Sequence, residues 1–116
     1  MEITKVKGHV NLKPGDEKAF LNAVAEVGPI AVAFDVEEDF MSYGGGIFNS
    51  EICDSYMINH AILITGYKTE KKSLQKYWIV KNSWGEDWGE EGYIRVARED
   101  PPNLCGILAI GVYPIL

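Results

Sequence analysis

Residues 77–93 read YWIVKNSWGEDWGEEGY, and this stretch decides the interpretation of the whole chain. It holds all three tryptophans, three glycines and an amide, Asn82, at the end of an apolar run that predicts a strand. A tryptophan-rich corner of a β core, with glycines in tight turns, explains the glycines and Trp78. It does not explain Asn82, because a buried amide needs hydrogen-bond partners. An imidazole N–H is a suitable donor to such an amide.

One helix and several short strands surround this stretch. Turn and capping residues at 14–17 precede apolar residues at helical spacing, and Gly28-Pro29 cannot continue a helix. We therefore expect one main helix over about 16–27. Apolar runs predict strands at 30–34, 43–48, 61–67, 77–82, 92–97 and 107–113. The order predicts an α+β fold, in which an antiparallel, barrel-like sheet packs against the helix.

Length, composition and charge limit the classes of protein that fit. The 116 residues are 47% hydrophobic and 24% charged, which is typical of one globular domain over 1–116. The net charge of −6, with no basic run, argues against nucleic acid or an anionic membrane surface as a partner. No apolar stretch reaches the length of a bilayer span, and the first residues show no secretory signal.

The chain has two histidines with different surroundings. His9 lies in a polar segment and is most simply a surface residue, whereas His60 opens an apolar strand directly after Asn59. By itself His60 fits either a structural or a catalytic role. Two histidines without clustered cysteines or carboxylates do not make a metal ligand set, so we expect no metal and no cofactor.

Two cysteines, Cys53 and Cys105, permit one bridge but do not require it. Two buried free thiols are the alternative. If the bridge forms, closing so long a loop stabilises the fold by roughly 4 kcal/mol in the chain-entropy model, and it implies an oxidising compartment.

Several motifs in this order resemble the C-terminal half of papain-like cysteine proteases, with the cathepsin L-like branch as the nearest match. Asn59-His60-Ala61, the run 77–85 and Trp88-Gly89 carry the resemblance. Further matching segments are 8–10, 26–29, 43–48, 105–106 and 113–114. The resemblance thus covers nearly the whole chain.

The resemblance implies a Cys-His-Asn mechanism and a role for each matched residue. His60 is expected to be the general base and acid, and Asn82 to accept a hydrogen bond from the ring nitrogen that does not face the thiol. Trp84 is expected to cover that bond and to line the leaving-group side of the cleft. Asn59 is expected to offer a main-chain contact beside the scissile bond.

The same matching implies an apolar substrate pocket and a disulfide. The wall of the pocket for the second residue before the cut is expected to hold small and aliphatic side chains, namely Ala33, Ile58, Ala61 and Ile110. Without a charge there, the pocket favours an apolar residue. Cys53 and Cys105 match positions that are bridged in the family, so the resemblance implies a structural disulfide.

Two catalytic parts of the family are missing from these residues. Neither cysteine has the helix-start setting of the family's nucleophile, and the only glutamine, Gln75, lies in a polar loop with no cysteine after it. We therefore expect the C-terminal part of a cysteine endopeptidase, seen as a fragment, a partial gene model or a processed chain, and inactive alone. The alternatives are a non-enzymatic descendant that binds a peptide or protein, and a structural β domain.

The resemblance also implies partners and a location. We expect a peptide or protein substrate, the helical N-terminal half of the same protease, and a propeptide or cystatin-like inhibitor as partners. A lysosomal or extracellular location is implied and agrees with a disulfide.

Overall fold

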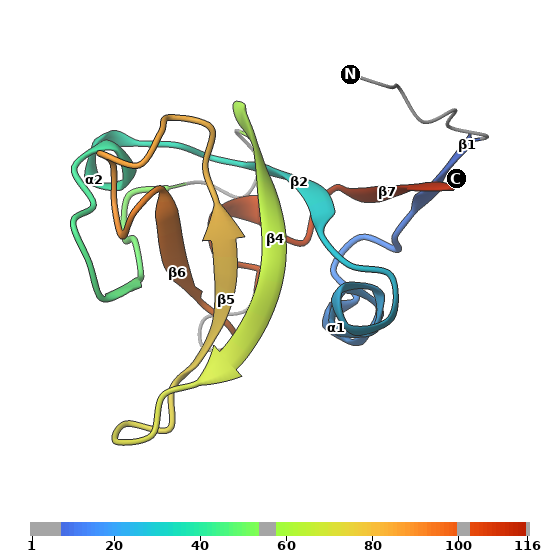
Figure 1. The fold of residues 1–116 in the computed structure, drawn as a ribbon, viewed down its shortest axis with the longest axis horizontal. Helices are drawn as coiled ribbons and strands as arrows, with labels where there is room; N and C mark the ends of the chain where they lie inside the picture. Colours follow the sequence, from blue (N-terminus) through green and yellow to red (C-terminus); the bar gives the residue numbers. More distant parts are fainter. Residues whose placement is uncertain (1–7, 54–57, 100–102, 116) are drawn as a thin grey trace.

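The computed structural model describes residues 8–53, 58–99 and 103–115. Figure 1 shows one curved sheet with a helix beside it and the chain ends at one side. The elements, in chain order, are β1 (Gly8–Asn11), α1 (Glu17–Glu26), β2 (Ile30–Phe34), α2 (Glu38–Met41), β3 (Ile47–Phe48), β4 (His60–Thr69), β5 (Lys76–Lys81), β6 (Tyr93–Ala97), η1 (Leu104–Gly106) and β7 (Gly111–Ile115).

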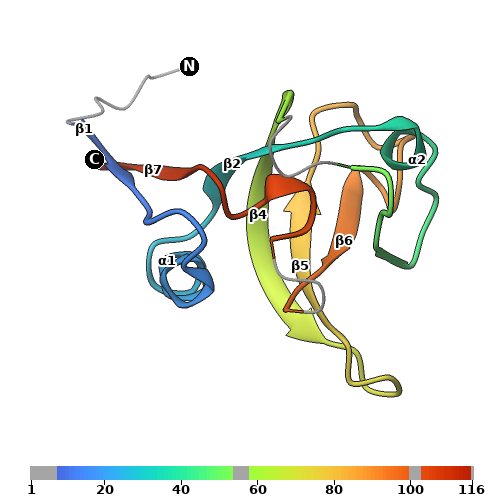
Figure 2. The same ribbon diagram turned by 180° about the vertical axis from the view of Figure 1, so that it is seen from behind.

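The strands of the described ranges form one sheet in the order β1-β7-β2-β4-β5-β6-β3. All neighbours are antiparallel except β3 and β6, which run parallel. Because β1 and β3 are the two edges, the sheet is open and does not close into the expected barrel-like form. The α+β class with one main helix is confirmed. Figure 2 shows the chain running along β2, beside the long β4, from the side of α1 toward that of α2.

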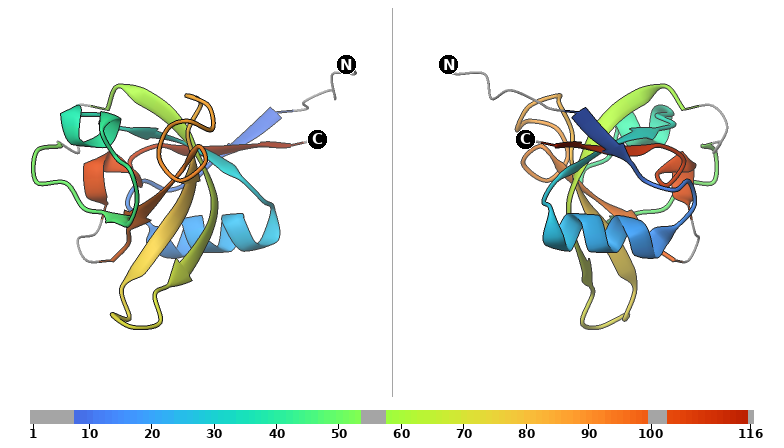
Figure 3. Two further views of the ribbon diagram at one scale, coloured as in Figure 1. Left: turned by 60° about the vertical axis from the view of Figure 1, so that its left-hand side comes forward. Right: turned by 90° about the vertical axis from the view of Figure 1, so that its right-hand side faces the viewer.

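The main helix forms where its capping residues predict it. The Asp16 side chain caps α1 by accepting a hydrogen bond from the Ala19 N–H at 3.1 Å. The helix ends at Glu26 with Val27 as its C-cap, and the following Gly28 has a φ of 123°, which favours glycine. Figure 3 shows α1 lying across the direction of β4, against which it packs.

Alternation along β2 and β4 divides the sheet into two faces. Val32 and Phe34 of β2 are buried in the core, as is Ile62 of β4. Their neighbours point to the opposite face, where Ala33 is half-buried and Ala61 is exposed.

Four segments differ from the predictions. The first is β1 (Gly8–Asn11), a strand that was not among those expected. A helical turn, α2, forms between the strands expected over 30–34 and 43–48, where no helix was predicted, and its Phe40 is fully buried. The strand expected over 43–48 shortens to Ile47–Phe48. The strand expected over 107–113 begins only at Gly111, because the Asn103 side chain accepts the Leu108 N–H at 2.7 Å and holds the preceding residues in a turn.

The structure contains a disulfide between Cys53 and Cys105. It joins the segment after β3 to η1, across 52 positions of the sequence. Both cysteines of the chain are therefore used in one bond, and neither is a free thiol.

Candidate active site

The imidazole of His60 and the amide of Asn82 meet at one end of two paired strands. His60 is the first residue of β4, and Asn82 directly follows β5. The His60 Nε2 atom lies 2.9 Å from Asn82 Oδ1. Asn82 is only 4% exposed, and its backbone N–H donates to the Gly92 carbonyl at 3.0 Å. The residues that the sequence singled out are thus in direct contact.

The contacts of Asn82 settle the orientation of both side chains. Its Oδ1 also accepts the Ser83 backbone N–H at 2.8 Å, which identifies this atom as the oxygen of the amide. An oxygen can only accept, so His60 donates through Nε2. In the neutral imidazole, Nδ1 then carries the lone pair. Within the described ranges Nδ1 has no hydrogen-bond partner, so it is available to take a proton.

An aromatic group lies against this pair. The Trp84 ring centre is 5.2 Å from that of His60, and the side chain is still 41% exposed. The ring centres of Phe40 and Trp88 lie 5.5 and 5.4 Å from that of Trp84, and both contacts are edge-to-face. Trp84 therefore lies against the imidazole and keeps an exposed surface of its own.

Asn59 is tied to the loop after β2 by both ends of its amide. Its Oδ1 accepts the Val36 N–H at 2.8 Å, and its Nδ2 donates to the Val36 carbonyl and to Asp35 Oδ1 at 3.2 and 3.3 Å. Asp35 is 1% exposed. Its hydrogen bond with the Glu37 side chain raises the pKa of Glu37. Asp35 and Val36 help to fix the residue before His60. Sequence reasoning missed them because no local pattern links 35–36 to Asn59.

Ala33 is a backbone neighbour of two other residues predicted for the pocket. Ala33 of β2 lies opposite Ala61 of β4, and the Ala33 N–H donates to the Ile110 carbonyl at 3.4 Å. The Ile110 side chain is 52% exposed. Ile58 is half-buried and lies before the paired part of β4. A hollow of about 390 Å³ adjoins Ala61 and reaches Asn82, and its lining is mainly apolar. Of the four predicted pocket residues, Ala61 lines it, whereas Ala33, Ile58 and Ile110 do not.

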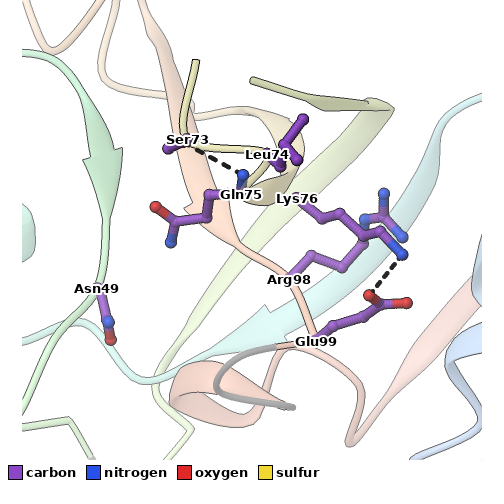
Figure 4. A pocket seen from close by; sticks show the side chains of 7 residues that line it. All are labelled: Asn49, Ser73, Leu74, Gln75, Lys76, Arg98 and Glu99. Carbon is purple, nitrogen blue, oxygen red and sulfur yellow. Dashed lines mark hydrogen bonds and ion pairs between the residues drawn. The ribbon is translucent and has the colours of Figure 1, made fainter. Parts of the chain in front are cut away.

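A larger hollow, of about 510 Å³, lies away from this site, next to the turn between β4 and β5 (Figure 4). Its residues are Asn49, Ser73, Leu74, Gln75, Lys76, Arg98 and Glu99. An ion pair of 2.8 Å joins Lys76 and Glu99 there. None of the predicted site residues lines this hollow.

The described residues contain no cluster of three or more histidine, cysteine or acidic side chains that could hold a metal ion. No described helix is long and apolar enough to cross a membrane.

Comparison with known families gives one match along the chain. The model of the papain family cysteine proteases matches residues 1–115. A cathepsin L-like proteinase of Fasciola hepatica is 46% identical over 114 residues, which are 98% of this chain and 34% of that protein. Cathepsin K of Mus musculus is 45% identical over 111 residues, which are 95% of this chain and 33% of that protein.

Solved structures give the same answer for the fold. Digestive procathepsin L 3 from the larval midgut of Tenebrio molitor superposes with a TM-score of 0.92 at 41% identity, covering 98% of this chain and 36% of that one. The bromelain protease from Ananas comosus, solved with the E64 inhibitor, gives 0.88 at 40% identity, covering 96% and 51%. The chain spans about a third of the length of the curated relatives that it matches. By sequence and fold, this chain belongs to the papain family of cysteine proteases.

Proposed function

We propose that this chain supplies the histidine base and the orienting asparagine of a cathepsin L-like cysteine endopeptidase. The observation that carries the proposal is the 2.9 Å contact between His60 Nε2 and Asn82 Oδ1, with Trp84 against the imidazole. A structural β domain has no need for an imidazole held in one tautomer. The same pair argues against a descendant that only binds peptides, because a binding surface does not need a free ring nitrogen.

The orientation of His60 defines its part in the reaction. Its Nδ1 takes the proton of a cysteine thiol, and the thiolate attacks the scissile carbonyl carbon. The resulting imidazolium gives that proton to the nitrogen of the leaving amine as the C–N bond breaks. His60 Nδ1 then takes a proton from water, whose oxygen attacks the acyl carbon. The C–S bond breaks, the acid product leaves, and the imidazolium returns the proton to the sulfur. Asn82 holds the ring in place in each step through Nε2.

The nucleophile and the side-chain oxyanion donor come from another part of the protease. Cys53 and Cys105 are bonded to one another, so neither can form the thiolate. The only glutamine of the chain, Gln75, lines the hollow beside the turn between β4 and β5, away from His60. We therefore propose that these residues form the C-terminal domain and do not hydrolyse peptides by themselves.

The face beside His60 supports a preference for an apolar substrate residue. Ala33 lies opposite Ala61 in the sheet, and its backbone N–H donates to the Ile110 carbonyl, so Ala33 links the other two residues. With Ile58, they form the proposed wall for the second residue before the cut. Asn59 is proposed to give a main-chain contact beside the scissile bond.

The family also points to partners and a location. The proposed partners are a peptide or protein substrate, the helical half of the same protease, and a propeptide or cystatin-like inhibitor. A structural neighbour solved as a procathepsin supports the propeptide. The disulfide supports a lysosomal or extracellular location, where such bonds persist.

The role of Asn82 is tested in the complete protease that carries this chain. A hydrogen bond to a charged group contributes about 1.5 to 3 kcal/mol, so Asn82→Ala is expected to lower kcat/KM by roughly 10- to 150-fold. Asn49→Ala is the matched control, because this exposed asparagine lies at the distant hollow. Equal activity of both variants contradicts the role of Asn82. Thiol-dependent hydrolysis by the 116-residue chain alone contradicts the outside origin of the nucleophile.

A further inference from the structure

A second polar cluster lies one loop away from the His60–Asn82 pair. The guanidinium of Arg95 on β6 donates two hydrogen bonds to the Glu90 carboxylate, at 2.9 and 2.8 Å. The Tyr43 hydroxyl is 3.0 Å from Glu90 Oε1, and it accepts the Arg95 backbone N–H at 3.4 Å. It also bonds to the Gly46 carbonyl. These contacts join three separate segments of the chain: the loop before β3, the loop 84–92, and β6.

The charges in this cluster stay fixed over a wide range of pH. The hydrogen bonds from Arg95 lower the pKa of Glu90, so the carboxylate remains ionised in mildly acidic solution. Burial raises the pKa of the Tyr43 hydroxyl, which therefore remains protonated. A two-pronged contact between a guanidinium and a carboxylate is directional as well as strong. The contact between Arg95 and Glu90 can therefore hold the backbone of the loop 84–92 against β6.

The loop that carries Glu90 packs closely on Tyr43. A Cβ atom added to Gly89 would lie 3.2 Å from the Tyr43 ring and 2.6 Å from the Tyr93 carbonyl oxygen. The next residue back, Trp88, lies 5.7 Å from the Tyr43 ring and donates its indole N–H to the Met41 carbonyl at 3.1 Å. The loop is thus fastened to its neighbour directly before Glu90.

The same loop begins at the tryptophan that covers the imidazole. The ring centre of Trp84 lies 5.4 Å from that of Trp88, in an edge-on contact, and 5.2 Å from that of His60, in a tilted one. The loop returns to the site at Gly92, whose carbonyl accepts the Asn82 backbone N–H. Both the group that covers the His60–Asn82 bond and the backbone that anchors Asn82 therefore depend on how this loop is held.

We propose that Glu90 is a positioning residue for the active site. Together with Arg95 and Tyr43, it holds the loop 84–92 so that Trp84 stays against His60 and shields its bond to Asn82. The effect on catalysis rests on the proposed function, whereas the effect on Trp84 does not. The competing explanation is that the aromatic contacts of Trp84 with Phe40 and Trp88 hold it without any help from the charged pair.

The test is NMR spectroscopy of the full 116-residue chain and of Glu90→Gln, which keeps the size of the side chain but removes its charge. The His60 ring Nε2–H signal reports directly on the shielded bond, because exchange with water broadens it when Trp84 moves. We expect this proton to exchange roughly tenfold faster in Glu90→Gln, the factor for one weakened charge-assisted hydrogen bond in a local opening. The nuclear Overhauser contacts between Trp84 and His60 are expected to weaken.

Two controls separate this effect from general loss of stability. Glu86→Gln removes an exposed carboxylate from the same loop and is expected to leave the exchange rate unchanged. If Glu90→Gln does not fold, Arg95→Lys is measured instead, because it keeps the charge and loses the two-pronged geometry. An unchanged exchange rate and unchanged Trp84 contacts in a folded variant overturn the proposal. A ring signal that persists in Asn82→Ala instead contradicts the proposed function, so the two failures are distinguishable.

Discussion

Removing the disulfide is expected to cost this chain a large share of its stability. The variant is the double replacement Cys53→Ala and Cys105→Ala, which breaks the bond without leaving a reactive thiol. Cys105 is 2% exposed and belongs to η1, where its carbonyl accepts the Asp35 N–H at 2.8 Å. The bond thus fastens the segment after β3 to the turn that holds Asp35.

The size of the effect follows from the length of the closed loop. The cysteines are 52 positions apart, and closing a loop of that length lowers the entropy of the unfolded chain. In the chain-entropy model this stabilises the folded state by about 4 kcal/mol. A domain of this size has a free energy of unfolding of roughly 5 to 15 kcal/mol, so the loss is easily measured.

The assay is urea denaturation of the oxidised chain and of the double variant, followed by tryptophan fluorescence at one pH and temperature. We expect the free energy of unfolding to fall by about 4 kcal/mol and the slope with urea to increase, because the unfolded variant exposes more surface. Dithiothreitol is expected to bring the native chain to nearly the same midpoint as the variant. A loss below about 1 kcal/mol refutes the reasoning from loop closure.

Three further predictions concern single residues. Gly89→Ala is expected to lower the free energy of unfolding by about 2 to 3 kcal/mol in urea titrations, because the new Cβ meets the Tyr93 carbonyl, whereas Gly44→Ala enters open space and changes little. Burial raises the pKa of Glu17, so its ionised form weakens the fold as the pH rises through the window between the ordinary and the raised value. The free energy of unfolding of Glu17→Gln, relative to that of the native chain, should therefore be higher at pH 7 than at pH 4. An equal difference between the two proteins at both pH values contradicts this sign. In the complete protease, Ala33→Asp should shift kcat/KM from leucine toward arginine at the second residue before the cut by roughly tenfold or more, and an unchanged ratio removes Ala33 from the pocket.

The main helix and the His60–Asn82 contact could be predicted because their signals are local or motif-based. Capping residues and helical spacing define α1. The position of Asn82 at the end of an apolar run predicted a hydrogen-bond donor such as an imidazole N–H. The disulfide followed from the resemblance, since the spacing of Cys53 and Cys105 left it undecided. These features depend on few neighbours, so one sequence was enough to predict them.

The supporting contacts could not be predicted, because they join distant segments without a local pattern. Tyr43 and Glu90 are 47 positions apart, and neither the strand expected over 43–48 nor the motif at 77–93 indicates a contact between them. Asn59 reaches Asp35 across 24 positions in the same way. The open sheet was also missed, since closure depends on whether the edge strands meet in space.

The central claim is that His60 is the base of a cysteine protease whose thiol lies in another part of the molecule. It is tested most directly by the kcat/KM of His60→Ala in the complete protease, measured with and without added imidazole. General acid–base catalysis contributes about 10² to 10⁴, so we predict a loss of at least roughly 10³-fold and partial recovery with imidazole. Activity within about tenfold of the native protease, with no response to imidazole, would contradict the role of His60.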